Sequence, residues 1–260
     1  MGKPFFSIIT VTLNDKRGLE RTLISVQNQT HKNFEHIIID GDSTDGSKEL
    51  LASIKSYRNM KWQSQPDNGI FDAMNKGIHM AQGKYLVFMN SGDVFAENST
   101  LSTVFPFLNN ERTNWAFGEM RLVDKNMKIL MHSNQRNLTQ RKLRFGLAYA
   151  PHQSTYYKGE FLKSLGGYDA SFQFAADQEL AYRAFQESSP IVIPEILCDF
   201  LEGGLHSRQG ILLRELLYHQ LRVKNKALLL RSKILDICFV GVIAFYRKNR
   251  RFLSSQFKGF

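Results

Sequence analysis

The sequence predicts an α/β protein built on a mostly parallel, doubly wound sheet. Two short apolar runs, residues 37–39 and 85–89, each lead into an acidic, glycine-containing turn that carries Asp40 or Asp93. An apolar run with a polar carboxyl end is typical of a buried parallel strand. Apolar residues recur at helical spacing between these runs. This alternation of strand and helix with short connections predicts the fold class.

The first quarter of the chain predicts one strand–helix–strand unit. Residues 5–11 are apolar and β-branched, which favours a first strand. Leu19, Leu23 and Val26 follow at spacings of four and three, which indicates an amphipathic helix. We expect the second strand at residues 36–39.

A second helix is expected after Asp42 and Asp45, which we interpret mainly as turn and helix-cap residues. Residues 65–69 (Gln-Pro-Asp-Asn-Gly) have the composition of a loop. The helical spacing of Phe71, Met74, Ile78 and Ala81 predicts a helix that ends at Gln82-Gly83, ahead of the strand at 85–89.

The pattern is weaker beyond residue 100. We expect a strand at 115–118, a polar loop at 134–147 and a turn at 166–169. A helix should run from Asp177 to about Gln186. From Ile211 onward the sequence is helical and rich in leucine, with interleaved Lys and Arg.

The net charge of +10 lies entirely in the last fifth of the chain. Residues 208–260 hold twelve Lys and Arg against two acids, so residues 1–207 are neutral. We therefore expect a catalytic body at 1–207 and a basic attachment region at 208–260. Residues 234–246 contain one charge, but thirteen residues fall short of the roughly 20 that span a bilayer. An amphipathic helix in the interface of an anionic membrane fits better, and a solvated face or an oligomer contact is the alternative.

Cellular location follows from the cysteines and the N-terminus. Cys198 and Cys238 form no disulfide framework or metal-ligand spacing, and the first ten residues lack a signal-peptide pattern. We expect a cytoplasmic protein on the inner face of the cell membrane. Nucleic-acid binding is not expected, since charge alone is no evidence for it.

The acidic strand ends predict the general chemistry. Ligands bind at the carboxyl ends of the strands in open α/β sheets. Carboxylates at that edge indicate a divalent metal between protein and phosphate. The residues by themselves therefore favour an enzyme that uses a nucleotide or a nucleotide sugar.

Several motifs together resemble the inverting, family-two glycosyltransferases with the GT-A fold. Those shared with the nucleotide-binding half of the family are residues 9–14 (ITVTLN), 25–30 (SVQNQT) and 40–46 (DGDSTDG). Those shared with a branch that builds bacterial surface polysaccharides are 67–77 (DNGIFDAMNKG), 90–93 (NSGD), 151–153 (PHQ) and 175–177 (AAD). The matches keep their order from residue 5 to about 206. The resemblance implies a nucleotide-binding half at 1–98 and an acceptor half at 99–207.

The resemblance implies roles for individual residues. Asp93 matches the last acid of the family's Asp-x-Asp motif and would bind Mn²⁺ or Mg²⁺, with His206 as a further ligand. Asp177 would be the general base, with Glu179 as the competing candidate. His152 is a candidate for contacts with the acceptor or the diphosphate. The implied donor-binding residues are Thr10, Asp40, Asp67, Asn68, Gly69, Asn75 and Ser91.

Two positions depart from the family pattern. Ser91 stands where the motif has its first acid, which leaves one direct carboxylate for the metal. Gly41 stands where relatives have a second acid beside Asp40, so the choice of base is open.

The implied reaction is inverting, metal-dependent transfer of a hexosyl or N-acetylhexosaminyl group from a nucleoside diphosphate sugar, with UDP as the expected carrier. The expected acceptor is a carbohydrate on a polyprenyl diphosphate. One alternative is a nucleotidyltransferase, although residues 10–17 lack a Gly-rich phosphate loop. The other is a non-catalytic module that binds polysaccharide or membrane.

Overall fold

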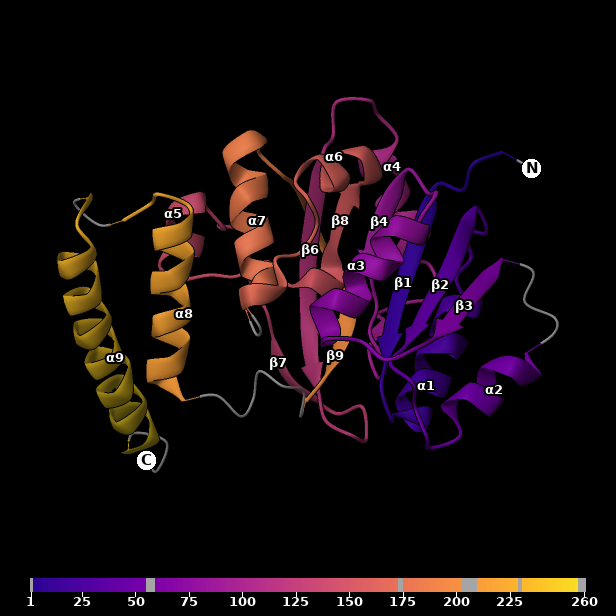
Figure 1. Ribbon diagram of the computed structural model, residues 1–260, viewed down its shortest axis with the longest axis horizontal. Helices are drawn as coiled ribbons and strands as arrows, with labels where there is room; N and C mark the ends of the chain where they lie inside the picture. Colours follow the sequence, from indigo (N-terminus) through magenta and orange to yellow (C-terminus); the bar gives the residue numbers. More distant parts are fainter. Residues whose placement is uncertain (1, 55–58, 173–174, 203–209, 229–230, 257–260) are drawn as a thin grey trace.

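The computed structural model describes residues 2–54, 59–172, 175–202, 210–228 and 231–256. One nine-stranded mixed sheet runs through the body of the molecule, in the order β3-β2-β1-β4-β8-β6-β9-β5, with β7 paired to β6 (Figure 1). The predicted α/β class is therefore confirmed.

The N-terminal half of the sheet is parallel, as predicted. β1 (Phe6–Thr12) pairs with β2 (Phe34–Asp40) on one side and with β4 (Tyr85–Phe88) on the other, and β3 (Met60–Ser64) pairs with β2. The register places Thr12 opposite Asp40. The carboxyl ends of these strands therefore meet at one edge.

The second half of the sheet is mixed. β8 (Thr155–Lys158) is antiparallel to both β4 and β6 (Trp115–Val123). β9 (Ile191–Leu201) is parallel to β6 and antiparallel to the short β5 (Val94–Phe95). β7 (Ile129–His132) forms a hairpin with β6.

Both faces of the sheet are buried. Ile9, Val11, Ile37 and Ile39 pack on one face against α3 (Ile70–Met80), α6 (Gly159–Ser164) and α7 (Ala176–Glu187). The alternate residues Phe6, Ile8 and Ile38 point to the other face, under α1 (Lys16–Gln27), α2 (Ser47–Ser53) and α4 (Thr100–Leu108). Such double coverage explains why both strands are buried along their whole length and are largely apolar.

Helix α3 approaches β1 closely at a glycine. A Cβ built on Gly77 would lie 2.4 Å from Cγ2 of Ile9. Only glycine allows the helix to lie this near the strand.

Several elements were not predicted, for identifiable reasons. β3 lies at the edge of the sheet and is partly exposed, so it lacks a long apolar run. β9 contains Pro194 and Glu195, and α4 contains Pro106, all of which weaken the sequence signal. The stretch 134–147 was expected to be a loop, but it contains the short helix α5 (Gln140–Arg144).

The C-terminal region forms a helical hairpin at one end of the molecule, where α8 (Ile211–Lys224) packs against α9 (Lys233–Gln256) (Figure 1). A buried ionic cluster joins the two helices. Arg222 donates from Nε to both oxygens of Asp236, at 2.9 and 3.0 Å, and His219 Nδ1 lies 2.6 Å from Asp236 Oδ2. Within the described ranges, no helix is both long and apolar enough to cross a membrane.

Glu35 of β2 is a buried acid that joins four segments of the N-terminal half. It accepts hydrogen bonds from the Ser7 hydroxyl on β1 and from the backbone amides of Gln82 and Gly83, and it pairs with Lys61 on β3. Burial alone would raise the pKa of Glu35, but these partners outweigh it and lower the pKa below its ordinary value.

We expect Glu35→Ala to lower the free energy of unfolding by about 2–4 kcal/mol at pH 7, because it leaves buried donors without an acceptor. Urea unfolding measures the difference. Because the folded-state pKa is lowered, the stabilisation is present above the unfolded pKa near 4.5 and is lost as the pH falls below it. The gap between variant and wild type should therefore narrow in acid.

Glu111→Ala is the matched control, since this acid is 83% exposed and pairs with Lys84 at the surface. We expect it to change stability far less than Glu35→Ala does, because solvent screens a surface ion pair. Equal effects of the two substitutions would contradict a special role for Glu35.

Candidate functional site

The ends of β1 and β2 form a polar edge with two polar groups that have no hydrogen-bond partner among the described residues. Asp40 is fully buried, and its Oδ2 accepts from the Ser43 amide at 3.0 Å and the Ser64 hydroxyl at 2.6 Å. Asp40 Oδ1 and the Thr12 hydroxyl lie buried without a hydrogen-bond partner among the described residues. A Cβ built on Gly41 would lie 2.7 Å from Asp67 Oδ2, so the glycine lets the Asp67 loop approach β2.

Two of the predicted donor-binding residues have internal partners. The Thr10 hydroxyl is fully buried, donates to the Met89 carbonyl at 2.7 Å and lies 2.8 Å from His36 Nε2. The Asn75 amide is held by both backbone groups of Tyr168, at 2.8 and 2.9 Å. Both side chains fasten distant segments together, and neither presents an unpaired group at the edge.

The 67–69 loop is an ordered turn before α3. Asp67 Oδ1 accepts from the Gly69 amide at 2.8 Å, and the Asn68 amide donates to Asp72 at 3.0 Å. Gly69 has φ +108°, which only glycine adopts easily. Asn68 is exposed, and Asp67 is half-buried with Oδ2 toward Gly41.

Asp93 lies buried just beyond β4, beside a second acid. Its Oδ2 accepts from Gln153 Nε2 at 3.1 Å, and its Oδ1 is 3.4 Å from the Leu201 amide. Ser91 donates to Asp15 Oδ2 at 2.8 Å. Asp15 comes from the β1–α1 connection, where it also caps α1 by accepting from the Gly18 amide.

The electrostatics of this corner suit a cation. Burial raises the pKa of Asp93 to about 6; the nearby His152 and the Gln153 amide oppose the rise, and the Asp15 carboxylate adds to it. A divalent ion beside Asp93 would offset both the burial and the repulsion, so the residues fit such an ion. No group of three His, Cys, Asp or Glu gathers as a ligand set in the described part of the chain. The remaining ligands would therefore be diphosphate oxygens and water, as is common for Mg²⁺.

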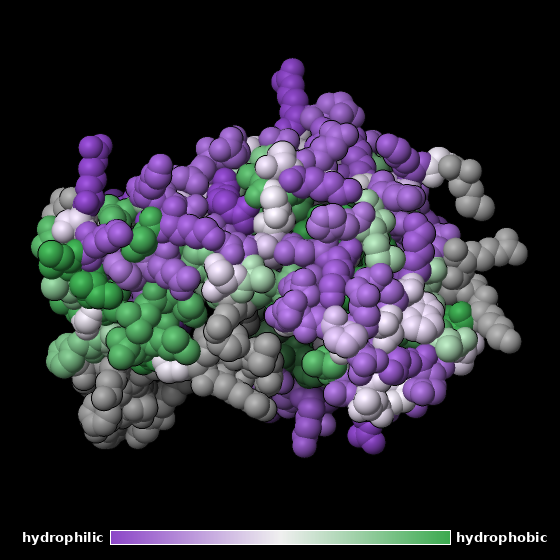
Figure 2. All heavy atoms as spheres, viewed as in Figure 1, coloured by the Kyte–Doolittle hydropathy of each residue, from purple (hydrophilic) through white to green (hydrophobic). Residues whose placement is uncertain are grey.

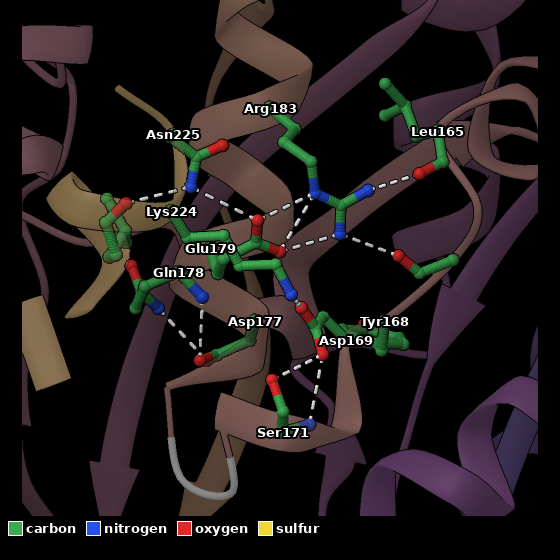
Figure 3. A network of polar contacts seen from close by, with 12 residues as sticks. Leu165, Tyr168, Asp169, Ser171, Asp177, Gln178, Glu179, Arg183, Lys224 and Asn225 are labelled. Carbon is green, nitrogen blue, oxygen red and sulfur yellow. Dashed lines mark hydrogen bonds and ion pairs between the residues drawn. The ribbon is translucent and has the colours of Figure 1, made fainter. Parts of the chain in front are cut away.

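Asp177 lies in the first turn of α7 and is 6% exposed. Its Oδ1 accepts from the Gln178 amide at 2.8 Å, and its Oδ2 accepts from Gln178 Nε2 at 3.0 Å (Figure 3). His152 Nδ1 lies 3.5 Å from the same Oδ2, and His152 Nε2 lies 3.0 Å from Asn90 Nδ2. His152 therefore lies between this carboxylate and Asn90, which follows β4.

Glu179, the competing candidate base, is committed to an ion pair. It is 1% exposed, Arg183 donates to both of its oxygens, and Asn225 donates to Oε1 at 3.3 Å (Figure 3). Arg183 also binds the carbonyls of Leu165 and Gly167, while Lys224 forms an ion pair with Asp169. These contacts fasten the C-terminal end of α8 to α7, and they leave Asp177 as the better-placed acid.

Other predicted residues are accounted for locally or lie outside the described ranges. Asp45 accepts from the Ser47 amide and hydroxyl in the turn that leads into α2, as expected of a turn residue, although the N-cap itself is Gly46; Asp42 pairs with Lys48. His206 lies outside the described residues.

Sequence reasoning assigned no role to Thr12, Asp15, Asn90 or Gln153. Thr12 and Asp15 follow the first predicted strand, so the rule that ligands bind at strand ends was available to identify them. Gln153 was part of a quoted motif, but its contact with Asp93 spans 60 residues. No local pattern predicts such a contact.

Comparison with known proteins supplies independent information. Residues 7–166 match the model of the family "Glycosyl transferase family 2". An uncharacterized glycosyltransferase of Mycobacterium tuberculosis is 35% identical over 215 residues, which cover 79% of this chain and 78% of the relative. A PGL/p-HBAD biosynthesis glycosyltransferase of Mycobacterium bovis is 28% identical over 197 residues, 74% of this chain and 73% of the relative.

Solved structures share the fold. TarS of S. aureus (residues 1–349), in complex with UDP-GlcNAc, matches with a TM-score of 0.70 at 19% identity, over 85% of this chain and 66% of that one. A mannosyltransferase from Pyrobaculum calidifontis, in complex with GDP-Man and Mn²⁺, matches with a TM-score of 0.64 at 18% identity, over 86% and 64%. This chain thus spans just under two thirds of the length of these structures.

We expect Asp93→Asn to stabilise the metal-free protein at pH 7–8 by about 1–3 kcal/mol. The folded pKa near 6 exceeds the ordinary 3.8, so ionisation of Asp93 costs stability above pH 6 and none below about pH 4. Urea unfolding in EDTA from pH 4 to 8 should show the difference growing as the pH rises.

Asp42→Asn serves as the control, because this carboxylate is 49% exposed. It should give no such gain. An Asp93→Asn protein that is less stable than wild type at pH 8 would contradict the electrostatic assignment.

Proposed function

Because the chain belongs to glycosyl transferase family 2, we propose that it moves a sugar from a nucleoside diphosphate, with inversion, to a hydroxyl of a carbohydrate acceptor. Hexose or N-acetylhexosamine carried on UDP is the expected donor. The acceptor is proposed to be carried on a polyprenyl diphosphate, in the synthesis of a bacterial surface polysaccharide. The nucleotidyltransferase reading is set aside, since the family is one of glycosyltransferases.

The observation that carries this proposal is the placement of two buried carboxylates on the two sides of one short turn. η1 (His152–Ser154) holds Asp93 through Gln153 and borders on Asp177 through His152. Inverting transfer needs a charge-stabilised leaving group and, on the opposite side of C1, a base for the acceptor. Asp93 and Asp177 are proposed for these roles.

The donor nucleotide is proposed to lie along the ends of β1 and β2. Thr12 and Asp40 Oδ1 offer unpaired groups there among the described residues, and Asp67 borders the same edge at Gly41. One solved neighbour is a complex with UDP-GlcNAc and another is a complex with GDP-Man. The same fold thus accepts different nucleotide bases. The proposed preference for UDP is tested below with a panel of nucleotide sugars.

The diphosphate is proposed to lie near Asp93, Ser91 and Asp15. A bound Mn²⁺ or Mg²⁺ would neutralise the charge that develops on the diphosphate as its bond to the sugar breaks. Asp93 would hold the ion, and Asp15 would supply the second negative charge that Ser91 lacks. Their mutual repulsion, which adds to the raised pKa of Asp93, supports this pairing.

Asp177 is proposed to take the proton from the acceptor hydroxyl as that oxygen attacks C1. It lies in the first turn of α7, and Gln178 donates to each of its oxygens, which orients the carboxylate. The new C1–O bond forms as the bond to the diphosphate breaks.

We expect Asp177→Asn to lower kcat by about 10²–10⁴-fold, the usual contribution of a general base, while donor affinity is kept.

Asp93→Ala should abolish the metal-dependent rise in melting temperature that the donor causes. A thermal-shift panel of UDP- and GDP-sugars with Mn²⁺ identifies the donor first, because a ligand that binds the folded state raises the melting temperature.

The control for both variants is Glu187→Gln, an exposed acid at the far end of α7. It should leave turnover unchanged. Full turnover by purified, folded Asp177→Asn would remove the assignment of the base, and the absence of donor binding in wild type would favour a non-catalytic module.

The α8–α9 hairpin is proposed to rest on the anionic inner face of the membrane. Its only two acids, Glu215 and Asp236, are 2% and 0% exposed, so its surface charge is basic. Apolar side chains gather over the same helices (Figure 2). The exposed ones are Leu212, Leu213, Leu216, Ile234, Leu235, Ile237, Val242 and Phe245. Apolar and basic groups on one helical unit suit the headgroup region of such a membrane.

We expect the triple variant Ile234→Ser, Val242→Ser, Phe245→Ser to lose at least about 10-fold in affinity for vesicles of phosphatidylglycerol and phosphatidylcholine. The wild-type protein should bind the phosphatidylglycerol-containing vesicles in low salt and should not bind vesicles of pure phosphatidylcholine. Each basic residue contributes on the order of 1 kcal/mol to binding at an anionic surface. Vesicle sedimentation measures both. Truncation after residue 207 should also abolish binding.

The matched control changes two exposed apolar residues elsewhere, Ile24 and Ile129, to Ser. Unchanged vesicle binding by the triple variant would overturn the membrane proposal. If the triple variant instead converted a dimer to a monomer in analytical ultracentrifugation, the hairpin would be a subunit contact.

A further inference from the structure

We propose that His152 is a positioning residue, which donates Nδ1–H to Asp177 Oδ2 and thereby fixes the carboxylate that receives the acceptor's proton. The proposal rests on the function proposed above for Asp177. The two ring nitrogens of His152 face protein groups, Nε2 toward Asn90 and Nδ1 toward Asp177, so His152 acts through Asp177 rather than by direct contact with substrate.

The backbone around His152 is firmly held. It begins the short turn η1 after Pro151, whose carbonyl accepts from the Thr155 hydroxyl at 2.7 Å. The Ser154 hydroxyl donates to the Gly118 carbonyl on β6 at 3.0 Å. The ring is thus carried by a segment that is fixed to the sheet.

Asn90 selects the tautomer of the ring. With the Asn90 amide oriented as in this structure, Nδ2 lies 3.0 Å from His152 Nε2, so Nε2 accepts and the proton of a neutral ring sits on Nδ1. Asn90 Oδ1 is then buried without a hydrogen-bond partner among the described residues. That nitrogen lies 3.5 Å from Asp177 Oδ2. The opposite tautomer would turn the lone pair of Nδ1 toward the carboxylate, which is repulsive. The 3.5 Å separation is long, as is common for catalytic hydrogen bonds in proteins without bound substrate.

His152 supplies a restraint that the neighbouring Gln178 does not. Gln178 is adjacent in sequence and lies on the same helix, so its hydrogen bonds move together with Asp177. His152 lies 25 residues away on a different element. Its contact therefore fixes Asp177 relative to the sheet, and Gln153, the next residue, holds Asp93 from the same turn. The turn therefore fixes the Asp93 and Asp177 carboxylates relative to each other.

Three substitutions separate positioning from packing. The side-chain amide nitrogen of an asparagine is bonded to Cγ, as Nδ1 is in histidine, whereas that of a glutamine lies one bond further out, where Nε2 lies. We therefore expect His152→Asn to retain kcat within about 10-fold, and His152→Gln and His152→Leu to lose about 10- to 100-fold, the usual cost of removing an orienting partner. KM for the donor should change less than kcat in all three, because Gln153, which holds Asp93, is left in place.

A spectroscopic measurement tests the hydrogen bond without turnover. Long-range ¹H–¹⁵N spectra of the imidazole should show His152 protonated at Nδ1 at pH 7 in wild type. Asn90→Leu should shift the population toward Nε2–H. An unprotonated Nδ1 in wild type overturns the proposal.

The kinetic outcomes are equally decisive. Wild-type kcat in His152→Leu, or equal losses in His152→Asn and His152→Leu, overturns positioning by the Nδ1 donor. Full activity of Asp177→Asn overturns the proposed function instead, and the positioning role with it. The two failures are therefore distinguishable.

Discussion

The site depends first on the parallel pairing of β1 with β2 and with β4. This pairing brings three strand ends to one edge, with Thr12 opposite Asp40 and with Asp93 just beyond β4. It persists because alternate residues of β1 and β2 are buried on opposite faces of the sheet. A slip of one residue would exchange the two faces, so the hydrophobic pattern also fixes where each polar end lies.

The second half of the molecule adds the groups that the parallel half lacks. The antiparallel β8 is preceded by η1, which enters beside the end of β4. Asp93 therefore receives Gln153 and Asp177 receives His152 from a single turn. Because Pro151, Ser154 and Thr155 fix this turn, the two carboxylates keep a set relation although they are 84 residues apart in sequence.

The sequence predicted the parallel half well because its information is local there. The apolar runs at 37–39 and 85–89 appear in the structure as β2 and β4, and the helical spacings before and between them appear as α1 and α3. The mixed half was largely missed, since β8 and β9 have no distinctive local pattern. The same limit applies to the site. Asp93 and Asp177 were proposed from motifs, whereas the contacts that η1 makes with them and with Asn90 arise only on folding. Thr10 and Asn75 show the converse, because their motif positions serve internal hydrogen bonds.

The C-terminal hairpin bears on the chemistry through a short chain of contacts. Asn225, at the end of α8, binds Glu179, and Glu179 holds Arg183 one turn further along α7. Asp177 precedes Glu179 by two residues on the same helix, so α8 and the proposed base form one packed unit. Between the helices, Arg222 and His219 surround the buried Asp236, which makes sliding of α9 along α8 costly, since it would leave that charge unpaired. A surface that binds this hairpin would therefore also set the position of the acceptor side of the site. For an acceptor held on a lipid, a fixed distance between Asp177 and the membrane surface would limit which acceptor hydroxyl reaches Asp177.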